Sequence, residues 1–131
     1  MIHEFLEKLS LELSISPAPK LNEKKYFSLQ FAPEVTLALF DLRPGVAMST
    51  KIAPCPEMKQ EELFMYLMRA NLLGQGTGGA RIGLDESEKN LTLSLGLPYE
   101  MNYKTFKEAL EEFLNHLVYW QGELKKFESE K

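Results

Sequence analysis

The middle of the chain carries the stretch that decides the fold: residues 69–80 read Arg-Ala-Asn-Leu-Leu-Gly-Gln-Gly-Thr-Gly-Gly-Ala. An apolar run that predicts a helix over residues 57–73 precedes the glycines, and a short strand is predicted after them, at 80–84. Gly74, Gly76 and Gly79 match the spacing of the dinucleotide-binding fingerprint, which requires a strand before the glycines and a helix after them. Because the order here is the reverse, the glycines predict a helix end and a tight connection instead of a nucleotide site.

Toward the C-terminus, the pattern changes from strand to helix. Residues 91–97 place a leucine at every second position, after a polar turn at 85–90, and this alternation is typical of a half-buried strand. Asn102 can cap a last helix, in which apolar residues recur at spacings of three and four as far as Phe127. The second half of the chain therefore predicts helix, strand, strand, helix.

Toward the N-terminus, residues 2–15 have the apolar spacing of a helix that Pro17 and Pro19 end. Strands are predicted at 27–31, 35–42 and 46–52, and Pro56 suits the first position of the second helix. The short connections favour antiparallel pairing. We therefore expect an α+β fold in the order α-β-β-β-α-β-β-α, with three helices on an antiparallel sheet of about five strands.

Composition excludes several functional classes. The 131 residues include 15 Lys and Arg against 19 Asp and Glu, a net charge of -4, whereas a nucleic-acid-binding protein would carry a basic patch. Cys55 is the single cysteine, so no disulfide can form within the chain, and a reducing cytoplasm fits best. The N-terminus lacks the pattern of a secretion signal, and no apolar run is long enough to span a bilayer. We expect a cytoplasmic protein that neither binds nucleic acid nor inserts into a membrane.

The residues that most often carry catalysis or bind metals are sparse. His116 has Glu112 one helical turn before it, but a metal site would need further ligands that the sequence does not supply nearby. Cys55 lies between two prolines and has no evident partner that would complete a catalytic set. Neighbouring carboxylates such as Glu61 and Glu62 point in different directions on a helix. We therefore expect no enzymatic activity, no metal and no cofactor.

Apolar side chains, by contrast, exceed what one small core needs. The second half of the helix at 57–73 is apolar around most of its circumference, which indicates burial on more than one side. In so short a chain this pattern predicts binding to a second copy or to another protein. The six methionines suit an adaptable contact surface.

Residues 69–80 now support a more specific interpretation. Together with Ile82-Gly83-Leu84-Asp85, Leu91-Thr92-Leu93-Ser94 and Leu97-Pro98, and with Phe106, Ala109–Phe113 and Trp120 of the last helix, they closely resemble the class I chaperones of type III secretion systems, the Tir-chaperone family. The resemblance implies that residues 1–131 form a single chaperone-like domain, a homodimer of the bacterial cytoplasm without enzymatic activity. It also implies binding to the N-terminal segment of one or more secreted effectors, which is held extended, soluble and competent for export.

On this basis two surfaces can be predicted. The dimer interface is assigned to Leu63, Phe64, Leu67 and Met68, with the last hairpin as a further contributor. Effector binding is assigned to Phe5, Leu9, Leu13, Phe27, Leu29 and Leu39. An extended peptide can also add a strand at a free sheet edge. The alternative is a dimeric adaptor or regulator of the secretion system, which would bind a non-secreted protein through the same fold.

Overall fold

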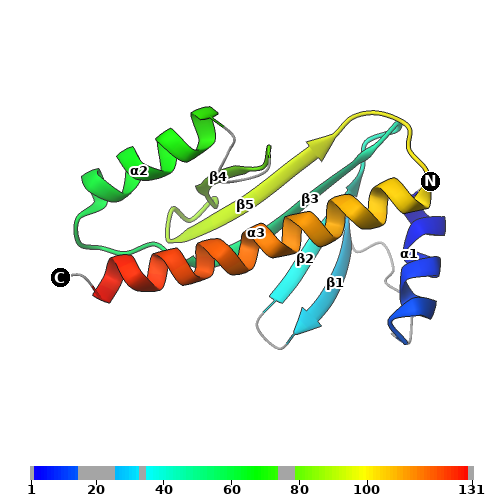
Figure 1. The fold of residues 1–131 in the computed structure, drawn as a ribbon, viewed down its shortest axis with the longest axis horizontal. Coiled ribbons are helices and arrows are strands. Elements are labelled where there is room, and N and C mark those ends of the chain that lie inside the picture. The colour runs from blue at the N-terminus through cyan, green and yellow to red at the C-terminus, as the bar shows by residue number, and fades with distance from the viewer. Residues whose placement is uncertain (1, 15–25, 33–34, 74–78, 130–131) are drawn as a thin grey trace. The chain divides into compact units, whose positions relative to one another are not determined.

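The computed structural model describes residues 2–14, 26–32, 35–73 and 79–129. These residues form three helices and one five-stranded antiparallel sheet, in the predicted order α1-β1-β2-β3-α2-β4-β5-α3 (Figure 1). The strands lie in the order β1-β2-β3-β5-β4, so that β1 and β4 are the edge strands. The predicted α+β fold is thus confirmed. The contacts group into two compact units, Met1–Thr50 with Gly96–Leu110, and Lys51–Leu95 with Glu111–Lys131.

The first unit is built on one buried face of the sheet. It contains α1 (Ile2–Glu12), β1 (Phe27–Ala32), β2 (Val35–Asp41), most of β3 (Val46–Pro54) and the first turns of α3 (Tyr103–Ser129). Leu29 of β1 pairs with Leu37 of β2, and Leu39 pairs with Met48 of β3. All four side chains are buried, because alternate residues of neighbouring strands point to the same side of a sheet.

The helical side of this unit is held by aromatic contacts. α1 buries an apolar stripe that includes Phe5 and Leu9, and the Phe5 ring stacks on the Phe106 ring of α3 with 5.0 Å between centroids. Lys107 of α3 also pairs with Glu12 at the end of α1. The amphipathic pattern of α1 therefore fixes that helix against the beginning of α3.

The second unit places a helix beside the β4–β5 hairpin. It contains the end of β3, α2 (Gln60–Leu73), β4 (Arg81–Leu84), most of β5 (Asn90–Leu97) and the rest of α3. The buried residues of this unit are mainly apolar and include Leu63, Leu67, Leu91, Leu93, Phe113, Leu117, Trp120 and Leu124. The leucine alternation of β5 supplies the sheet side of this core, since Leu91 and Leu93 are almost fully buried.

Helix ends are where the sequence predictions and the structure differ. α1 ends at Glu12 and not at residue 15, because Ser14 has a φ of 57°, which no α-helix accommodates. α2 begins at Gln60, so the assignment of Pro56 to its first position was wrong. Lys59 has a φ of 58° and breaks the helical path just before α2. The cap at the start of α3 is confirmed, since Asn102 Oδ1 accepts a hydrogen bond from the Thr105 amide at 2.9 Å.

Candidate functional site

The helix α2 has two opposite apolar faces. Leu63 and Leu67 point into the core of their unit and are buried. Met65, Met68 and Leu72 follow one another at spacings of three and four on the other side, where Met68 is 68% and Leu72 85% exposed. One face thus stabilises the unit itself, and the other is left uncovered.

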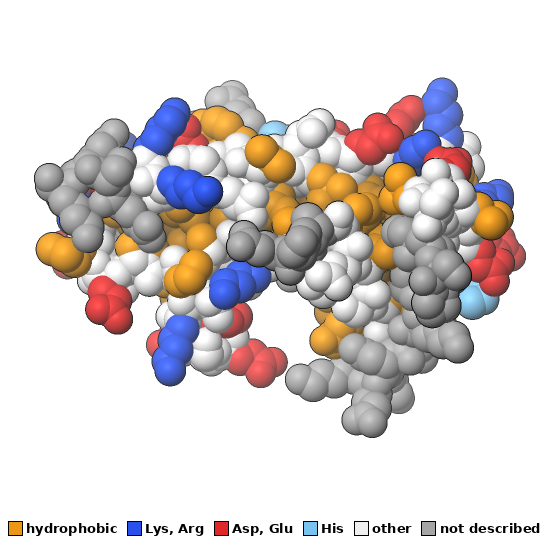
Figure 2. Space-filling view, turned by 90° about the horizontal axis from the view of Figure 1, so that it is seen from below, with side chains coloured by type: hydrophobic (Ala, Val, Ile, Leu, Met, Phe, Trp, Pro, Cys, Tyr) orange, Lys and Arg blue, Asp and Glu red, His pale blue; other side chains and the backbone are white. Residues whose placement is uncertain are grey.

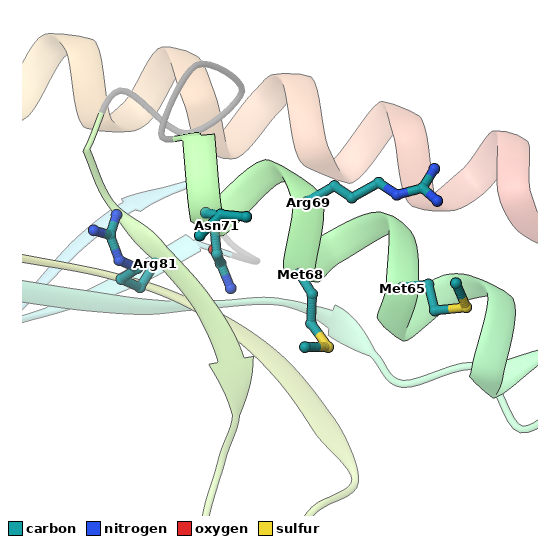
Figure 3. Close-up of a pocket in the computed structure, with 6 residues that line it drawn as sticks. Met65, Met68, Arg69, Asn71 and Arg81 are labelled. Atoms are coloured by element: carbon teal, nitrogen blue, oxygen red, sulfur yellow. The ribbon is translucent and has the colours of Figure 1, made fainter.

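An open groove of about 610 Å³ runs along this uncovered face (Figure 3). The described residues that line it are Met65, Met68, Arg69, Asn71 and Leu72 of α2 together with Arg81 of β4. Arg69 forms no ion pair with any residue that the structure describes. Apolar side chains edged by two cations make a surface that suits a partner carrying both apolar and acidic groups.

A second, smaller hollow of about 320 Å³ adjoins the first, since Met68 and Asn71 line both. Its other lining residues are Phe64, Leu67, Ile82, Gly83, Leu84 and Leu91. Leu84 is exposed, whereas Ile82 is buried. We refer to the exposed side chains of Met65, Met68, Leu72 and Leu84, with Arg69 and Arg81, as the α2–β4 surface.

Two contacts hold α2 in place beneath this surface. The Asn71 side chain donates a hydrogen bond from Nδ2 to the Ile82 carbonyl at 2.8 Å and accepts one at Oδ1 from the Ile82 amide, also at 2.8 Å. Further along the helix, the Tyr66 ring lies 5.5 Å from that of Trp120, and the Tyr66 hydroxyl donates to Glu123 Oε2 at 3.3 Å. Burial, together with the Glu123 carboxylate, raises the pKa of Tyr66 to about 12, so this hydroxyl remains a donor at neutral pH.

The structure separates the four residues predicted for the dimer interface. Met68 is exposed on the α2–β4 surface, and the half-buried Phe64 lines the smaller hollow beside it. Leu63 and Leu67 lie in the core of the chain itself. Met65 and Leu72 share the exposed face with Met68 and were not among the predicted residues, although their spacing from Met68 places them on the same side of a helix. The interface assignment itself stays a prediction.

Most of the residues predicted for effector binding lie in the interior of the first unit. Phe5, Leu9, Phe27, Leu29 and Leu39 are all buried, so their side chains already pack against this chain. Leu13 alone of the six is exposed, at 47%. Among the described residues of this unit, the exposed large apolar side chains are Leu11, Leu13, Leu42 and Tyr99. The effector assignment remains a prediction, and Leu13 is the one residue of the set that a partner reaches without rearrangement.

Hydrophobic side chains emerge among charged ones on the molecular surface (Figure 2). In the described part of the chain, however, no helix has both the length and the apolar character needed to cross a membrane.

In the part of the chain that the structure describes, potential metal-binding groups are not brought together. His116 Nε2 and Glu112 Oε1 are 3.9 Å apart, and among the described residues no group of three or more His, Cys, Asp or Glu side chains is arranged to hold a metal ion. Burial raises the pKa of the Cys55 thiol, which disfavours the reactive thiolate.

The fold is shared with several solved structures. One chain of the ExsC–ExsE complex aligns with a TM-score of 0.73 at 19% identity, over 92% of this chain and 90% of that chain. One chain of the HopA1–SchA chaperone–effector complex aligns with a TM-score of 0.69 at 16% identity, over 92% of this chain and 93% of that chain. A chain from the structure of the Yersinia pestis type III secretion chaperone SycH with a stable fragment of YscM2 aligns with a TM-score of 0.64 at 16% identity. The alignment covers 88% of this chain and 95% of that chain. At these identities the likeness establishes the fold alone.

A curated protein of Chlamydia pneumoniae, CPj0713/CpB0740, is 32% identical over 69 residues, which amount to 53% of this chain and 52% of that protein. The chain thus spans about half the length of the curated relative that it matches. The family model of the Tir chaperone proteins matches much more of the sequence, from residue 4 to residue 121. The chain therefore belongs to the Tir chaperone protein (CesT) family, a family of type III secretion chaperones.

Proposed function

We propose that this chain is a cytoplasmic bacterial chaperone that binds the N-terminal segment of one or more type III effectors and keeps it soluble and competent for export. Membership of the Tir chaperone family over residues 4–121 carries the proposal. Two further observations support the proposal: this chain shares its fold with a chain of a chaperone–effector complex, and it exposes apolar side chains. Residues 1–131 act in this proposal as one non-enzymatic domain.

The α2–β4 surface is the proposed site of homodimerisation. A symmetric dimer uses the same patch on both copies, so the patch must complement itself. α2 meets this requirement, since Glu61 and Glu62 occupy its first turn, Arg69 lies near its end and Met68 lies between. Two such helices packed antiparallel bring the acidic end of each near the basic end of the other and bury the methionines between them.

Met68→Lys tests this dimer, with Val118→Lys as the matched control. Met68 on α2 and Val118 on α3 are equally exposed, at 68% and 67%, so neither substitution disturbs a core. Sedimentation velocity should show that Met68→Lys raises the dimer dissociation constant by at least about tenfold, because it places a charge in an apolar contact. Val118→Lys should leave the constant unchanged. Equal effects of the two substitutions would contradict the assignment.

Effector binding is proposed for the first unit, at the end of α1 and the outer edge of β1. β1 ends the sheet on this side, and an extended segment can pair with such an edge through main-chain hydrogen bonds while its side chains seek apolar contacts. Leu11 and Leu13 supply exposed apolar contacts in the same unit. Phe27 and Leu29 of β1 are buried, and they stay buried in this arrangement because a peptide that pairs with a strand edge bonds to backbone groups and not to side chains.

The partner is identified by purifying the tagged chain from its native bacterium and sequencing the bound proteins by mass spectrometry. Recovery of a protein that the type III system secretes, lost or reduced in Leu11→Asp/Leu13→Asp and retained in Val118→Lys, is the expected result. Recovery of a non-secreted regulator alone would favour the adaptor hypothesis instead. A chain that binds no secreted protein would contradict the proposed function.

A further inference from the structure

The strand β4 forms one edge of the sheet, and its hydrogen bonds determine which backbone groups point outward. In an antiparallel pair, opposed residues alternate between those that exchange backbone hydrogen bonds and those that do not. The Asp85 amide bonds to the Asn90 carbonyl at 3.0 Å, and the register then runs back through Leu84↔Leu91 and Gly83↔Thr92 to Ile82↔Leu93. Leu84 and Ile82 are therefore the residues whose N–H and C=O groups face away from β5.

The two outward groups of Ile82 are both bound by Asn71. Its carboxamide supplies one donor and one acceptor, the same groups that a residue of a neighbouring strand would supply, and both bonds are 2.8 Å long. While these bonds are in place, a peptide strand cannot pair with β4 at Ile82. The Ile82 side chain is buried, so its backbone groups would be costly to leave without partners.

Asn71 lies on α2 one turn beyond Met68, on the same side of the helix, and both residues line the two adjoining hollows. Arg81 and Leu84 border these hollows from the β4 side. The bonds from Asn71 to Ile82, which lies between Arg81 and Leu84 in the strand, therefore set the spacing between the exposed side chains of the two elements.

We propose that Asn71 is a positioning residue of the α2–β4 surface: its amide takes the place of a neighbouring strand at Ile82 and holds α2 and β4 in the register in which their exposed side chains form one contact surface for a second copy of the chain. The inference rests on the proposed dimer for its partner. The two bonds to Ile82 assign the positioning role to Asn71 in particular.

The test uses the full chain with two substitutions of Asn71 and one control. Asn71→Leu keeps the branching of the side chain and its number of heavy atoms but removes both bonds, whereas Asn71→Asp keeps an acceptor for the Ile82 amide and loses the donor to the Ile82 carbonyl. Asn115→Leu makes the same change at an exposed asparagine of α3. Amide hydrogen exchange resolved by residue reports on the two bonds, and sedimentation velocity reports on the dimer.

In Asn71→Leu, exchange of the Ile82 amide should accelerate by at least about tenfold, while the Leu93 amide of β5 keeps its wild-type rate. In Asn71→Asp the Ile82 amide should stay protected. Both substitutions should raise the dimer dissociation constant by at least about tenfold, and Asn115→Leu should change neither quantity. If Asn71→Leu does not fold, Asn71→Asp alone tests the inference. In that variant the Ile82 amide should stay protected while the dimer dissociation constant rises, whereas a general loss of stability would accelerate exchange and weaken the dimer together.

Unchanged exchange at Ile82 in Asn71→Leu, or acceleration shared equally by Leu93, would overturn the positioning role. A dimeric wild type whose dissociation constant is the same in all variants would contradict this inference but not the proposed function. A wild-type chain that is monomeric at every concentration would contradict the proposed dimer, and the positioning role with it.

Discussion

Gly45 and Gly122 show at the residue scale how the same amino acid can be required at one position and replaceable at another. Gly45, in the β2–β3 turn, has a φ of 101°, and a Cβ built there would lie 2.0 Å from the Leu97 carbonyl oxygen. Gly122 lies in α3, and a Cβ there meets nothing within 4 Å. The β2–β3 turn thus depends on its glycine, whereas the helix does not.

Gly45→Ala should lower the free energy of unfolding by at least about 1–3 kcal/mol, because alanine is strained at positive φ and its methyl group would clash with backbone. Gly122→Ala, the control, should raise it by up to about 1 kcal/mol, since alanine favours a helix interior. Urea unfolding followed by circular dichroism measures both. A Gly45→Ala protein as stable as wild type would show that this turn differs from the one described.

Asp85 should make the stability of the β4–β5 hairpin depend on pH. Its carboxylate accepts hydrogen bonds from the Asn90 side chain at 2.6 Å and the Ser87 hydroxyl at 2.7 Å, which lower the pKa of Asp85 from 3.8 to about 2. A native pKa below the unfolded value stabilises the fold above about pH 3.8, and this contribution is lost as the pH falls through about 2.

The stability difference between wild type and Asp85→Asn should therefore shrink as the pH is lowered from about 5 to about 2. Urea midpoints at several pH values measure this difference. Glu86→Gln, at the neighbouring exposed carboxylate, is the control and should retain the wild-type pH profile. A difference that does not vary with pH would exclude a stabilising role of the ionised Asp85.

Residue patterns alone did not separate core from surface. Leu67 and Met68 are adjacent in one apolar run, yet Leu67 is buried and Met68 exposed, because the packing of α2 beside β4 selects one side of the helix. Phe27 and Leu29 have the alternation of a half-buried strand, and this pattern cannot tell whether the covering partner is the chain's own helix or an effector.

At the scale of elements, prediction succeeded where one local signal was strong. The leucine alternation of β5 and the Asn102 cap of α3 are both confirmed. The predicted start of α2 was wrong: Pro56 is compatible with a first helical turn, but Lys59 has a positive φ just before Gln60, which the local pattern does not predict for a lysine. The pairing of Asn71 with Ile82 was missed because it joins a helix to a strand edge, and a local pattern does not show which elements become neighbours.

The cap of α3 should be measurable as helix stability. Asn102→Ala removes the acceptor for the Thr105 amide and should lower the free energy of unfolding by about 0.5–2 kcal/mol. Asn115→Ala, within the same helix and exposed, should leave it unchanged or slightly higher. Chemical denaturation of both variants distinguishes a loss of capping from a general effect of losing an asparagine.

At the scale of the whole molecule, the net charge of -4 and the exposed apolar side chains are consistent with the proposed role as a carrier of another chain. The family and the fold were both predictable, because the residues from Arg69 to Trp120 carry a specific resemblance. The proposed partner-binding surfaces were less predictable, since they are built from apolar residues that the fold leaves uncovered.

The most direct test of the proposed function is limited proteolysis of the partner bound to this chain, with the fragments identified by mass spectrometry. The proposal predicts one protected fragment from the N-terminal region of a secreted protein, which is digested along its whole length once the chain is removed, because it has no fold of its own. A protected fragment that remains resistant without the chain would show a folded partner and contradict the proposed function.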